Sequence, residues 1–121
     1  MPKKILIADD EPHLVRSLGF VLSKEGYEVL TASDGEEAMQ RVREFRPDLV
    51  FLDVMMPKRN GYEVCGDIKA SPELKGIRVI ILTAKGQETD RIQGLQAGAD
   101  DFFTKPFSPM AIMARVKEIL G

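Results

Sequence analysis

The 121-residue sequence has only one cysteine, Cys65, and no excess of positive charge. One cysteine cannot form a disulfide within the chain, and a single thiol fits a reducing compartment. The 17 lysine and arginine residues are outnumbered by 19 aspartate and glutamate residues, which gives a net charge of −2. Because broad nucleic-acid binding usually requires a basic face, we do not expect this chain to bind nucleic acid directly.

Long apolar runs are absent as well. After Met1-Pro2-Lys3-Lys4 the chain has only four apolar residues before the first acid, too few for the core of a signal peptide. No run approaches the roughly 20 residues that a membrane-spanning helix needs. We therefore expect a cytoplasmic protein that has no membrane partner.

The length is sufficient for one compact domain with a buried core. The sequence contains no internal repeat, low-complexity tract or linker, and its last predicted helix ends almost at Gly121. We therefore expect residues 1–121 to form a single domain.

Short apolar runs alternate five times with helical patterns, which predicts an α/β fold built from βα units around a parallel sheet. The predicted strands are 3–8, 27–31, 48–52, 77–82 and 99–104. The predicted helices are 12–24, 34–44, 61–69, 86–97 and 108–120. Strands 48–52 and 77–82 are apolar almost throughout, which is typical of central strands covered on both faces, whereas 27–31 is mixed and is expected at an edge.

Two helix starts carry capping patterns. Ser33-Asp34-Gly35-Glu36 matches a capping box that opens helix 34–44. Ser108-Pro109 is typical of a helix start, because serine caps the first turn and proline fits its first position.

Polar residues follow four of the apolar runs. Asp9 and Asp10 follow the first run, Asp53 ends the third, Thr83 follows the fourth and Lys105 follows the fifth. In an open α/β sheet the carboxyl ends of the strands share the edge at which ligands bind, so we expect these side chains to meet.

The expected cluster of acids requires a counter-charge. Two carboxylates held ~4 Å apart repel each other by about 4 kcal/mol at an effective dielectric constant of 20, so we expect a bound divalent cation. Few protein ligands, oxygen donors and a phosphate partner favour Mg²⁺ over Ca²⁺. This chemistry suits a carboxylate, Asp53, that accepts a phosphoryl group.

These residues together carry a family resemblance. The sequence resembles the receiver domain of bacterial two-component response regulators at Asp9-Asp10-Glu11-Pro12, Asp53, Met56-Pro57-Lys58-Arg59-Asn60-Gly61, Thr83-Ala84 and Lys105-Pro106-Phe107. The resemblance covers the whole chain in the same order and spacing. It implies a flavodoxin-like, doubly wound (βα)5 fold with strand order 2-1-3-4-5, the order known for chemotaxis receivers of this family.

The resemblance also implies a role for each residue of the cluster. Asp53 would take a phosphoryl group from a phosphohistidine on a sensor histidine kinase or a phosphotransfer protein. Asp10, Asp53 and the backbone carbonyl of Met55 would bind Mg²⁺ directly, and Asp9 would bind it through water. Positioning and charge neutralisation do most of the work in phosphoryl transfer, so these roles are physically reasonable.

Three further roles follow from the same resemblance. Lys105 would pair with Asp53 and then with the phosphoryl oxygens, and the Lys105-Pro106 bond would be cis. Thr83 would hydrogen-bond the phosphoryl group, and Phe102 would turn inward when Thr83 moves. The chain would then be a phosphorylation-dependent regulator that catalyses only its own phosphorylation and dephosphorylation. Its fourth helix, fifth strand and fifth helix would form the surface that controls a downstream partner or output domain.

Simpler interpretations remain open for single residues, and other functions for the whole site. Asp9, Asp10 and Glu11 alone could be an acidic first turn that stabilises the following helix. A haloacid-dehalogenase-like phosphohydrolase shares the Asp, Thr, Lys and Mg²⁺ set, but it needs a second acid at the position held by Met55. A flavin or nucleotide binder is disfavoured because no glycine-rich loop follows the first strand. A degenerate receiver that only binds partners predicts a broken site.

Residues 94–109 resemble receivers of winged-helix transcription factors. Those receivers dimerise through their fourth helix, fifth strand and fifth helix, using three ion pairs between subunits. By resemblance, Asp101 and Arg115 keep one pair, whereas the positions that would face Arg91 and Lys117 hold no acid. Since surface pairs are each worth only about 0–1 kcal/mol, this weakens the expectation of a phosphorylation-dependent homodimer without excluding it.

Two further features carry one prediction each. The first indicates a stand-alone receiver or a receiver cut from a longer regulator, and the second indicates a phosphoryl group that is lost slowly. Segment 69–76 is longer than is usual before the fourth strand of the family. Met55 lies at a position where the family tunes dephosphorylation, and a thioether cannot orient an attacking water by hydrogen bonding.

Overall fold

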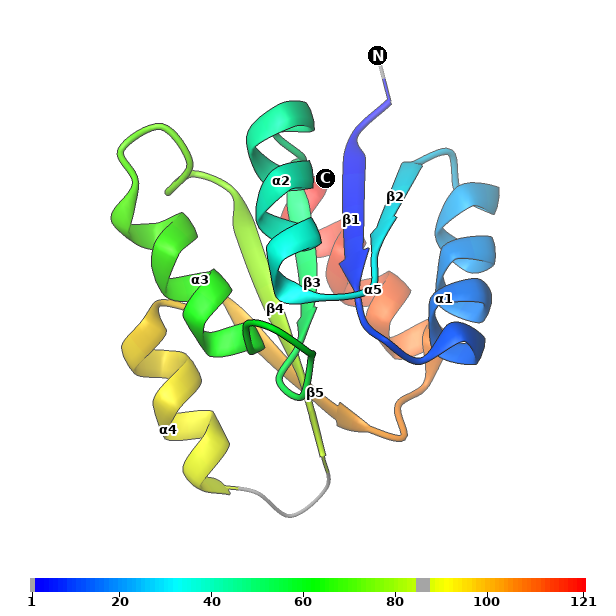
Figure 1. Cartoon of the computed structure of the whole chain (residues 1–121). Coiled ribbons are helices and arrows are strands. Elements are labelled where there is room, and N and C mark those ends of the chain that lie inside the picture. The colour runs from blue at the N-terminus through cyan, green and yellow to red at the C-terminus, as the bar shows by residue number, and fades with distance from the viewer. Residues whose placement is uncertain (1, 85–87) are drawn as a thin grey trace.

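The computed structural model describes residues 2–84 and 88–121, with the backbone alone for residues 88–91. Five strands alternate with five helices in this part of the chain (Figure 1). The strands are β1 (Lys4–Ala8), β2 (Glu28–Ala32), β3 (Leu49–Asp53), β4 (Arg78–Ala84) and β5 (Asp101–Lys105). The helices are α1 (Pro12–Lys24), α2 (Gly35–Phe45), α3 (Gly61–Ala70), α4 (Glu88–Ala97) and α5 (Pro109–Leu120).

All strand pairs are parallel, and the order across the sheet is β2-β1-β3-β4-β5. This order confirms the expected flavodoxin-like fold and puts β2 at an edge. The direction of winding reverses at β1, because β2 lies on one side of it and β3 on the other. The carboxyl ends of β1 and β3 therefore flank the place where open α/β sheets bind ligands.

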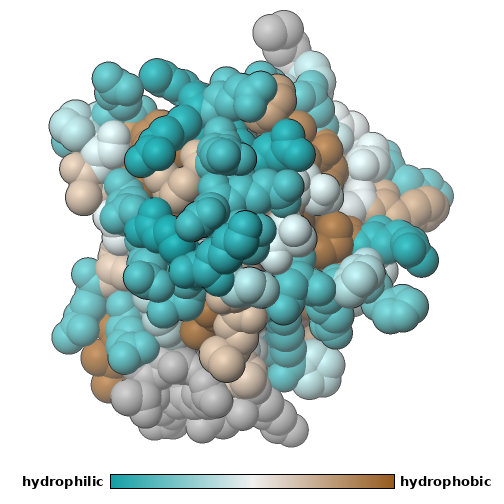
Figure 2. Space-filling view, in the orientation of Figure 1, coloured by the Kyte–Doolittle hydropathy of each residue, from teal (hydrophilic) through white to brown (hydrophobic). Residues whose placement is uncertain are grey.

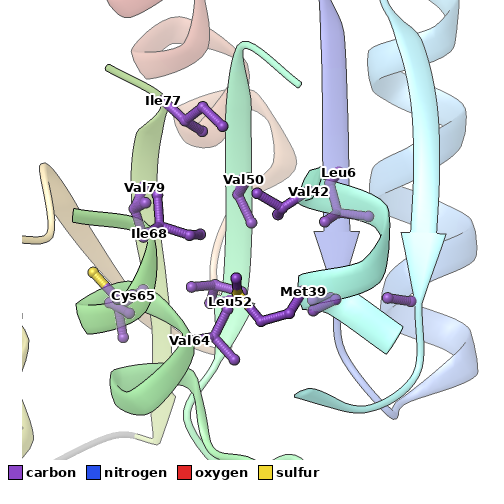
Figure 3. Packing of buried hydrophobic residues seen from close by; sticks show 14 of the residues in the cluster. Leu6, Met39, Val42, Val50, Leu52, Val64, Cys65, Ile68, Ile77 and Val79 are labelled. Atoms are coloured by element: carbon purple, nitrogen blue, oxygen red, sulfur yellow. The ribbon is translucent and has the colours of Figure 1, made fainter. Parts of the chain in front are cut away.

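The sheet is covered on both faces, and each face has its own apolar cluster. Helices α2 and α3 pack on one face, where the side chains of Met39, Val42, Val64, Cys65 and Ile68 lie among those of the strands (Figure 3). Helices α1 and α5 pack on the other face through Leu18, Leu22, Ile112, Met113 and Val116. The almost uninterrupted apolar sequences of β1, β3 and β4 follow from this double coverage.

The capping box predicted from Ser33 is wrong by one residue. The Asp34 side chain accepts the backbone N–H of Glu37 at 2.8 Å, and the Glu37 carboxylate accepts the N–H of Ser33 at 2.6 Å. Helix α2 consequently begins at Gly35. Ser33 and Asp34 are both good caps, so the sequence could not choose between them. The cap predicted at Ser108 is confirmed, since its hydroxyl accepts the N–H of Ala111.

Four strands, β2, β3, β4 and β5, end one or two residues later than predicted. Asp53 is the last residue of β3, where it pairs with Leu82, and Lys105 is the last residue of β5, where it pairs with Ala84. Strand β4 continues past the predicted end at residue 82. Asp53 and Lys105 are thus both held by the pairing of strands in the sheet. The helix predicted at 86–97 is described from residue 88 onward, and its first two residues lie outside the described part.

On the side of α2 and α3 the outer surface is mostly hydrophilic, as expected when the apolar sides of the helices face the sheet (Figure 2). Hydrophilic side chains occupy most of the face that carries α2 and α3 (Figure 2). Among the helices that the structure describes, none is long and apolar enough to cross a membrane.

Candidate functional site

Three carboxylates meet at the carboxyl edge of the sheet. Asp9 and Asp10 directly follow β1, and Asp53 ends β3, which pairs with β1 along its length. One carboxylate oxygen from each residue lies within 4.8 Å of the other two. Asp9 and Asp53 are buried, with 2% and 5% of their surface exposed, whereas Asp10 is exposed. The sequence prediction that these acids lie together is confirmed by this geometry.

Among the side chains that the structure describes, Lys105 is the one basic residue that forms ion pairs with these acids. Its Nζ lies 2.9 Å from Oδ2 of Asp9 and 3.4 Å from Oδ1 of Asp53. The resemblance predicted a pair with Asp53, and the structure shows that the ammonium bridges both acids and is closer to Asp9. The peptide bond between Lys105 and Pro106 is cis, as the resemblance implied.

The site has unbalanced negative charge. Burial and the charge of Asp9 raise the pKa of Asp53, although Lys105 and the N–H of Met55 act in the opposite direction. Burial alone would lower the pKa of Lys105, but its contacts with Asp9 and Asp53 raise it. Three carboxylates facing one ammonium leave an excess of two negative charges when all four groups are ionised.

These residues fit a divalent cation. The donor atoms are carboxylate oxygens, which suit Mg²⁺, and the acids come from two adjacent strand ends. Oδ2 of Asp9 is buried, and apart from its ion pair with Lys105 the described residues give it no hydrogen-bond donor. An oxygen with spare accepting capacity in a negatively charged crevice is the arrangement that a hydrated cation would complete.

The chain that follows Asp53 folds back over it. The N–H of Met55 lies 3.4 Å from Oδ1 of Asp53, and the Met55 side chain is 75% exposed. Because residue 55 is a methionine, no acidic side chain stands at this position beside Asp53. The expected metal contact of the Met55 carbonyl stays a prediction.

Gly61 belongs to the motif that follows Asp53, and the structure shows why a glycine stands there. A Cβ at this position would lie 2.5 Å from the carbonyl oxygen of Asp53. The N–H of Gly61 donates to the carbonyl of Val54 at 3.2 Å, which closes the turn after β3. The absence of a side chain lets α3 start directly beside Asp53. The sequence does carry a signal for this role. Gly61 is the first residue of a helix whose cap is already provided by Asn60, so capping does not explain the glycine.

Thr83 and Phe102 lie on the two strands beyond Asp53. Thr83 is buried in β4 next to the end of β3, and it pairs in register with Thr104 of β5. Phe102 is half-buried and belongs to the cluster beneath α3 and α4. Its ring lies against Gly94 of α4, since a Cβ on that glycine would be 2.1 Å from Cε1 of the ring. The structure thus puts Thr83 near the acceptor and Phe102 between β5 and α4.

The residues of the expected dimer surface are only partly described. Nε of Arg115 donates to Oδ2 of Asp101 at 2.6 Å within the same chain. Lys117 pairs with Glu25, the residue that caps the end of α1, at 3.3 Å. The side chain of Arg91 lies outside the described residues. The expectation that Asp101 and Arg115 pair across two subunits therefore stays untested.

Comparisons with known proteins agree with this geometry. A family model for the response regulator receiver domain matches residues 5–117. The alkaline phosphatase synthesis transcriptional regulatory protein PhoP of Bacillus subtilis is 49% identical over 120 residues, which are 99% of this chain and 49% of that protein. The chain spans about half the length of the curated relatives it matches.

Solved structures show the same likeness. A putative response regulator from Chloroflexus aurantiacus has a TM-score of 0.94 and 39% identity, and the match covers 99% of this chain and 98% of that one. The chemotaxis response regulator CheY4 of Vibrio cholerae has a TM-score of 0.91 and 28% identity, with 98% and 99% covered.

Proposed function

Because this chain belongs to the response regulator receiver family, we propose that Asp53 is its phosphoryl acceptor. Receiver domains of this family are the phosphoacceptors of two-component signalling, so the function class of the chain is a signalling regulator. The observation that carries the assignment to Asp53 is its place between two acids and an ammonium. Its carboxylate is buried at the end of β3, within 4.8 Å of Asp9 and Asp10 and 3.4 Å from Nζ of Lys105.

Mg²⁺ is the proposed cofactor. Asp10, Asp53 and the carbonyl of Met55 would hold it directly, and Asp9 would hold it through water. When bound, the cation would neutralise charge on the acceptor and on the phosphoryl oxygens. The excess of negative charge at the site and the spare accepting capacity of Asp9 support this proposal.

The chain's own groups then account for the transfer. A carboxylate oxygen of Asp53 attacks the phosphorus of a phosphohistidine, the new O–P bond forms, and the P–N bond to the imidazole breaks. The Lys105 ammonium, already within 3.4 Å of Asp53, neutralises the charge that the phosphoryl group brings. The Thr83 hydroxyl hydrogen-bonds a phosphoryl oxygen, and Phe102 moves with it, which changes the surface formed by α4, β5 and α5.

The partners follow from the family. A receiver domain implies a kinase that supplies the phosphoryl group and an output that reads it, and the curated relative from Bacillus subtilis is a transcriptional regulatory protein. We take a histidine kinase or phosphotransfer protein as the donor, and residues 1–121 as one receiver domain in the cytoplasm. A phosphorylated homodimer through α4, β5 and α5 would use Asp101 and Arg115 between subunits, and these two residues already contact each other within one chain.

A phosphodonor experiment tests the proposed function. The wild-type chain is incubated with acetyl phosphate and Mg²⁺, and intact mass is measured over time. One labile phosphoryl adduct is expected, and it should be absent from Asp53→Asn and after chelation of Mg²⁺. Glu28→Gln, an exposed change on the edge strand, serves as the matched control. Sustained turnover of phosphoester substrates, or an adduct that persists in Asp53→Asn, would contradict the proposal.

A further inference from the structure

The loop that follows Asp53, residues 54–60, lies between the amino ends of α2 and α3. On the α3 side, the N–H of Gly61 donates to the carbonyl of Val54 at 3.2 Å. On the α2 side, the N–H of Gly35 donates to the carbonyl of Pro57, also at 3.2 Å. The first backbone donor of each helix is thus used to hold the same loop.

The contact with α2 leaves no room for a side chain. A Cβ on Gly35 would lie 2.2 Å from the carbonyl oxygen of Arg59 and 2.5 Å from its Cβ, well inside the 3.4 Å at which ordinary contact begins. The atom it would meet first belongs to the backbone, so a rotamer change cannot relieve the clash. Any larger residue at position 35 must displace either the loop or the start of α2 by about an ångström.

Ion pairs reinforce the same junction. Nζ of Lys58 lies 3.8 Å from Oδ2 of Asp34 and 3.9 Å from Oε2 of Glu36, which flank Gly35. Arg59 pairs with Asp67 of α3. These pairs lie at the surface or partly buried and contribute little individually, but they orient the loop toward the two helices that hold its backbone.

The same loop carries the backbone beside the acceptor. The N–H of Met55 faces Oδ1 of Asp53 at 3.4 Å, and the carbonyl of Met55 is the proposed third Mg²⁺ ligand. A displacement at residues 57–59 would shift this backbone as well, because only a few residues separate them along the chain. We propose that Gly35 is a positioning residue that holds the loop after Asp53 in the conformation needed to bind Mg²⁺ and accept the phosphoryl group. This proposal rests on the proposed function.

The first test compares two glycine-to-alanine substitutions in helices. Gly35→Ala creates the clash, whereas a Cβ on Gly66 of α3 would meet nothing within 4 Å. Mg²⁺ affinity is measured by isothermal titration calorimetry on folded protein, together with the rate of adduct formation. Changes in the groups that support metal ligands typically weaken binding by 10–100-fold, so Gly35→Ala should raise the Mg²⁺ Kd by roughly tenfold. Gly66→Ala should bind Mg²⁺ as the wild type does.

The second test uses the wild-type chain and so does not depend on the folding of a variant. If the junction positions the metal ligands, bound Mg²⁺ must stabilise the junction by the same coupling free energy. The amide hydrogen of Gly35 should therefore exchange several-fold more slowly when Mg²⁺ is saturating. The amide of Glu28, at the amino end of β2 and thus at the opposite end of the strand from Gly35, provides the reference for global stabilisation.

The outcomes separate this inference from the proposed function. If wild-type chain neither binds Mg²⁺ nor takes a phosphoryl group, the proposed function fails. If it does both, an unchanged Mg²⁺ Kd in folded Gly35→Ala overturns the positioning role. Should that variant fail to fold, protection of the Gly35 amide that rises no more than that of Glu28 overturns it equally.

Discussion

Replacing Asp53 by asparagine should stabilise the fold when no divalent cation is bound. The buried carboxylate of Asp53 faces Asp9 and Asp10 within 4.8 Å, and Lys105 is 3.4 Å away. Asparagine keeps the shape of the side chain but removes its charge. Lys105 retains its closer contact, 2.9 Å from Asp9, so the substitution leaves no buried ammonium without a partner.

The magnitude follows from these distances. At an effective dielectric constant of 20, each repulsion taken at the 4.8 Å upper limit is about 3.5 kcal/mol, and the attraction to Lys105 at 3.4 Å is about 5 kcal/mol. The two repulsions together exceed the one attraction by about 2 kcal/mol. Water screens the exposed Asp10, while the burial of Asp53 acts in the same direction as the repulsion. We therefore expect a gain of about 1–2 kcal/mol, or roughly 4–8 °C in Tm for a domain of this size.

Thermal unfolding by circular dichroism in a chelating buffer measures this gain. Glu28→Gln is the control, because an exposed substitution should change stability by no more than about 0.5 kcal/mol. The order should reverse with Mg²⁺, since a ligand at a hundred times its Kd stabilises the wild type by about 2.7 kcal/mol. Asp53→Asn should gain much less. A variant that is less stable than wild type in the chelating buffer would refute the electrostatic argument.

The pH dependence has the same origin. Below the ordinary value of 3.8 the Asp53 carboxyl is protonated in the folded and the unfolded chain, and it then resembles asparagine. The fold raises the pKa of Asp53, which means that the protonated carboxyl is more favourable in the folded chain than the ionised one. The wild type therefore loses stability as the pH rises from 3.8 through the raised pKa. The gap between wild type and Asp53→Asn should therefore open in the window just above pH 3.8 and stay open at neutral pH.

Three other outcomes follow from the structure. Gly94→Ala should be at least about 1 kcal/mol less stable than Gly66→Ala in urea unfolding. A Cβ at position 94 would lie 2.1 Å from the Phe102 ring, whereas a Cβ at position 66 would meet nothing within 4 Å. Equal stabilities would contradict the contact between Gly94 and Phe102. Burial raises the pKa of Cys65 to about 11, so its thiol should react with a disulfide reagent at least about a hundredfold more slowly in folded than in urea-unfolded protein, and similar rates would contradict its burial. Wild-type adduct should decay slowly after removal of the phosphodonor, and Met55→Asn should shorten its lifetime by about tenfold, because an amide can orient the attacking water; rapid loss from the wild type would contradict the role given to Met55.

Much of the fold could be predicted from local patterns. The apolar runs of β1, β3 and β4 and the helix-start residues Pro12 and Ser108 gave the elements to within one or two residues in most cases. The strand order came from the family resemblance, because periodicity does not say which strands are neighbours. The structure puts the acids in the predicted place because parallel strands align their carboxyl ends.

The remaining errors come from contacts between distant residues. Strand β5 begins at Asp101 and not at residue 99, because the Asp100 carboxylate accepts the N–H of Val79 at 2.8 Å and the Lys69 ammonium at 3.0 Å. These residues stabilise the turn before the strand, and no local pattern indicates them.

Within the site, the contact of Lys105 with Asp9 and the steric need for Gly35 were also invisible in the sequence. Each depends on the approach of two segments that are far apart in the chain. The residue types of the site could be read from the sequence, but the contacts that position them could not.

The most direct measurement is the location of the phosphoryl group. Wild-type protein is phosphorylated with acetyl phosphate and Mg²⁺, the acyl phosphate is reduced with borohydride, and peptides are mapped by tandem mass spectrometry. Reduction converts a phosphorylated aspartate to homoserine, which marks its position by mass. We expect homoserine at position 53 and at no other aspartate. Homoserine at position 9 or 10, or none at all under conditions in which Mg²⁺ binds, would contradict it.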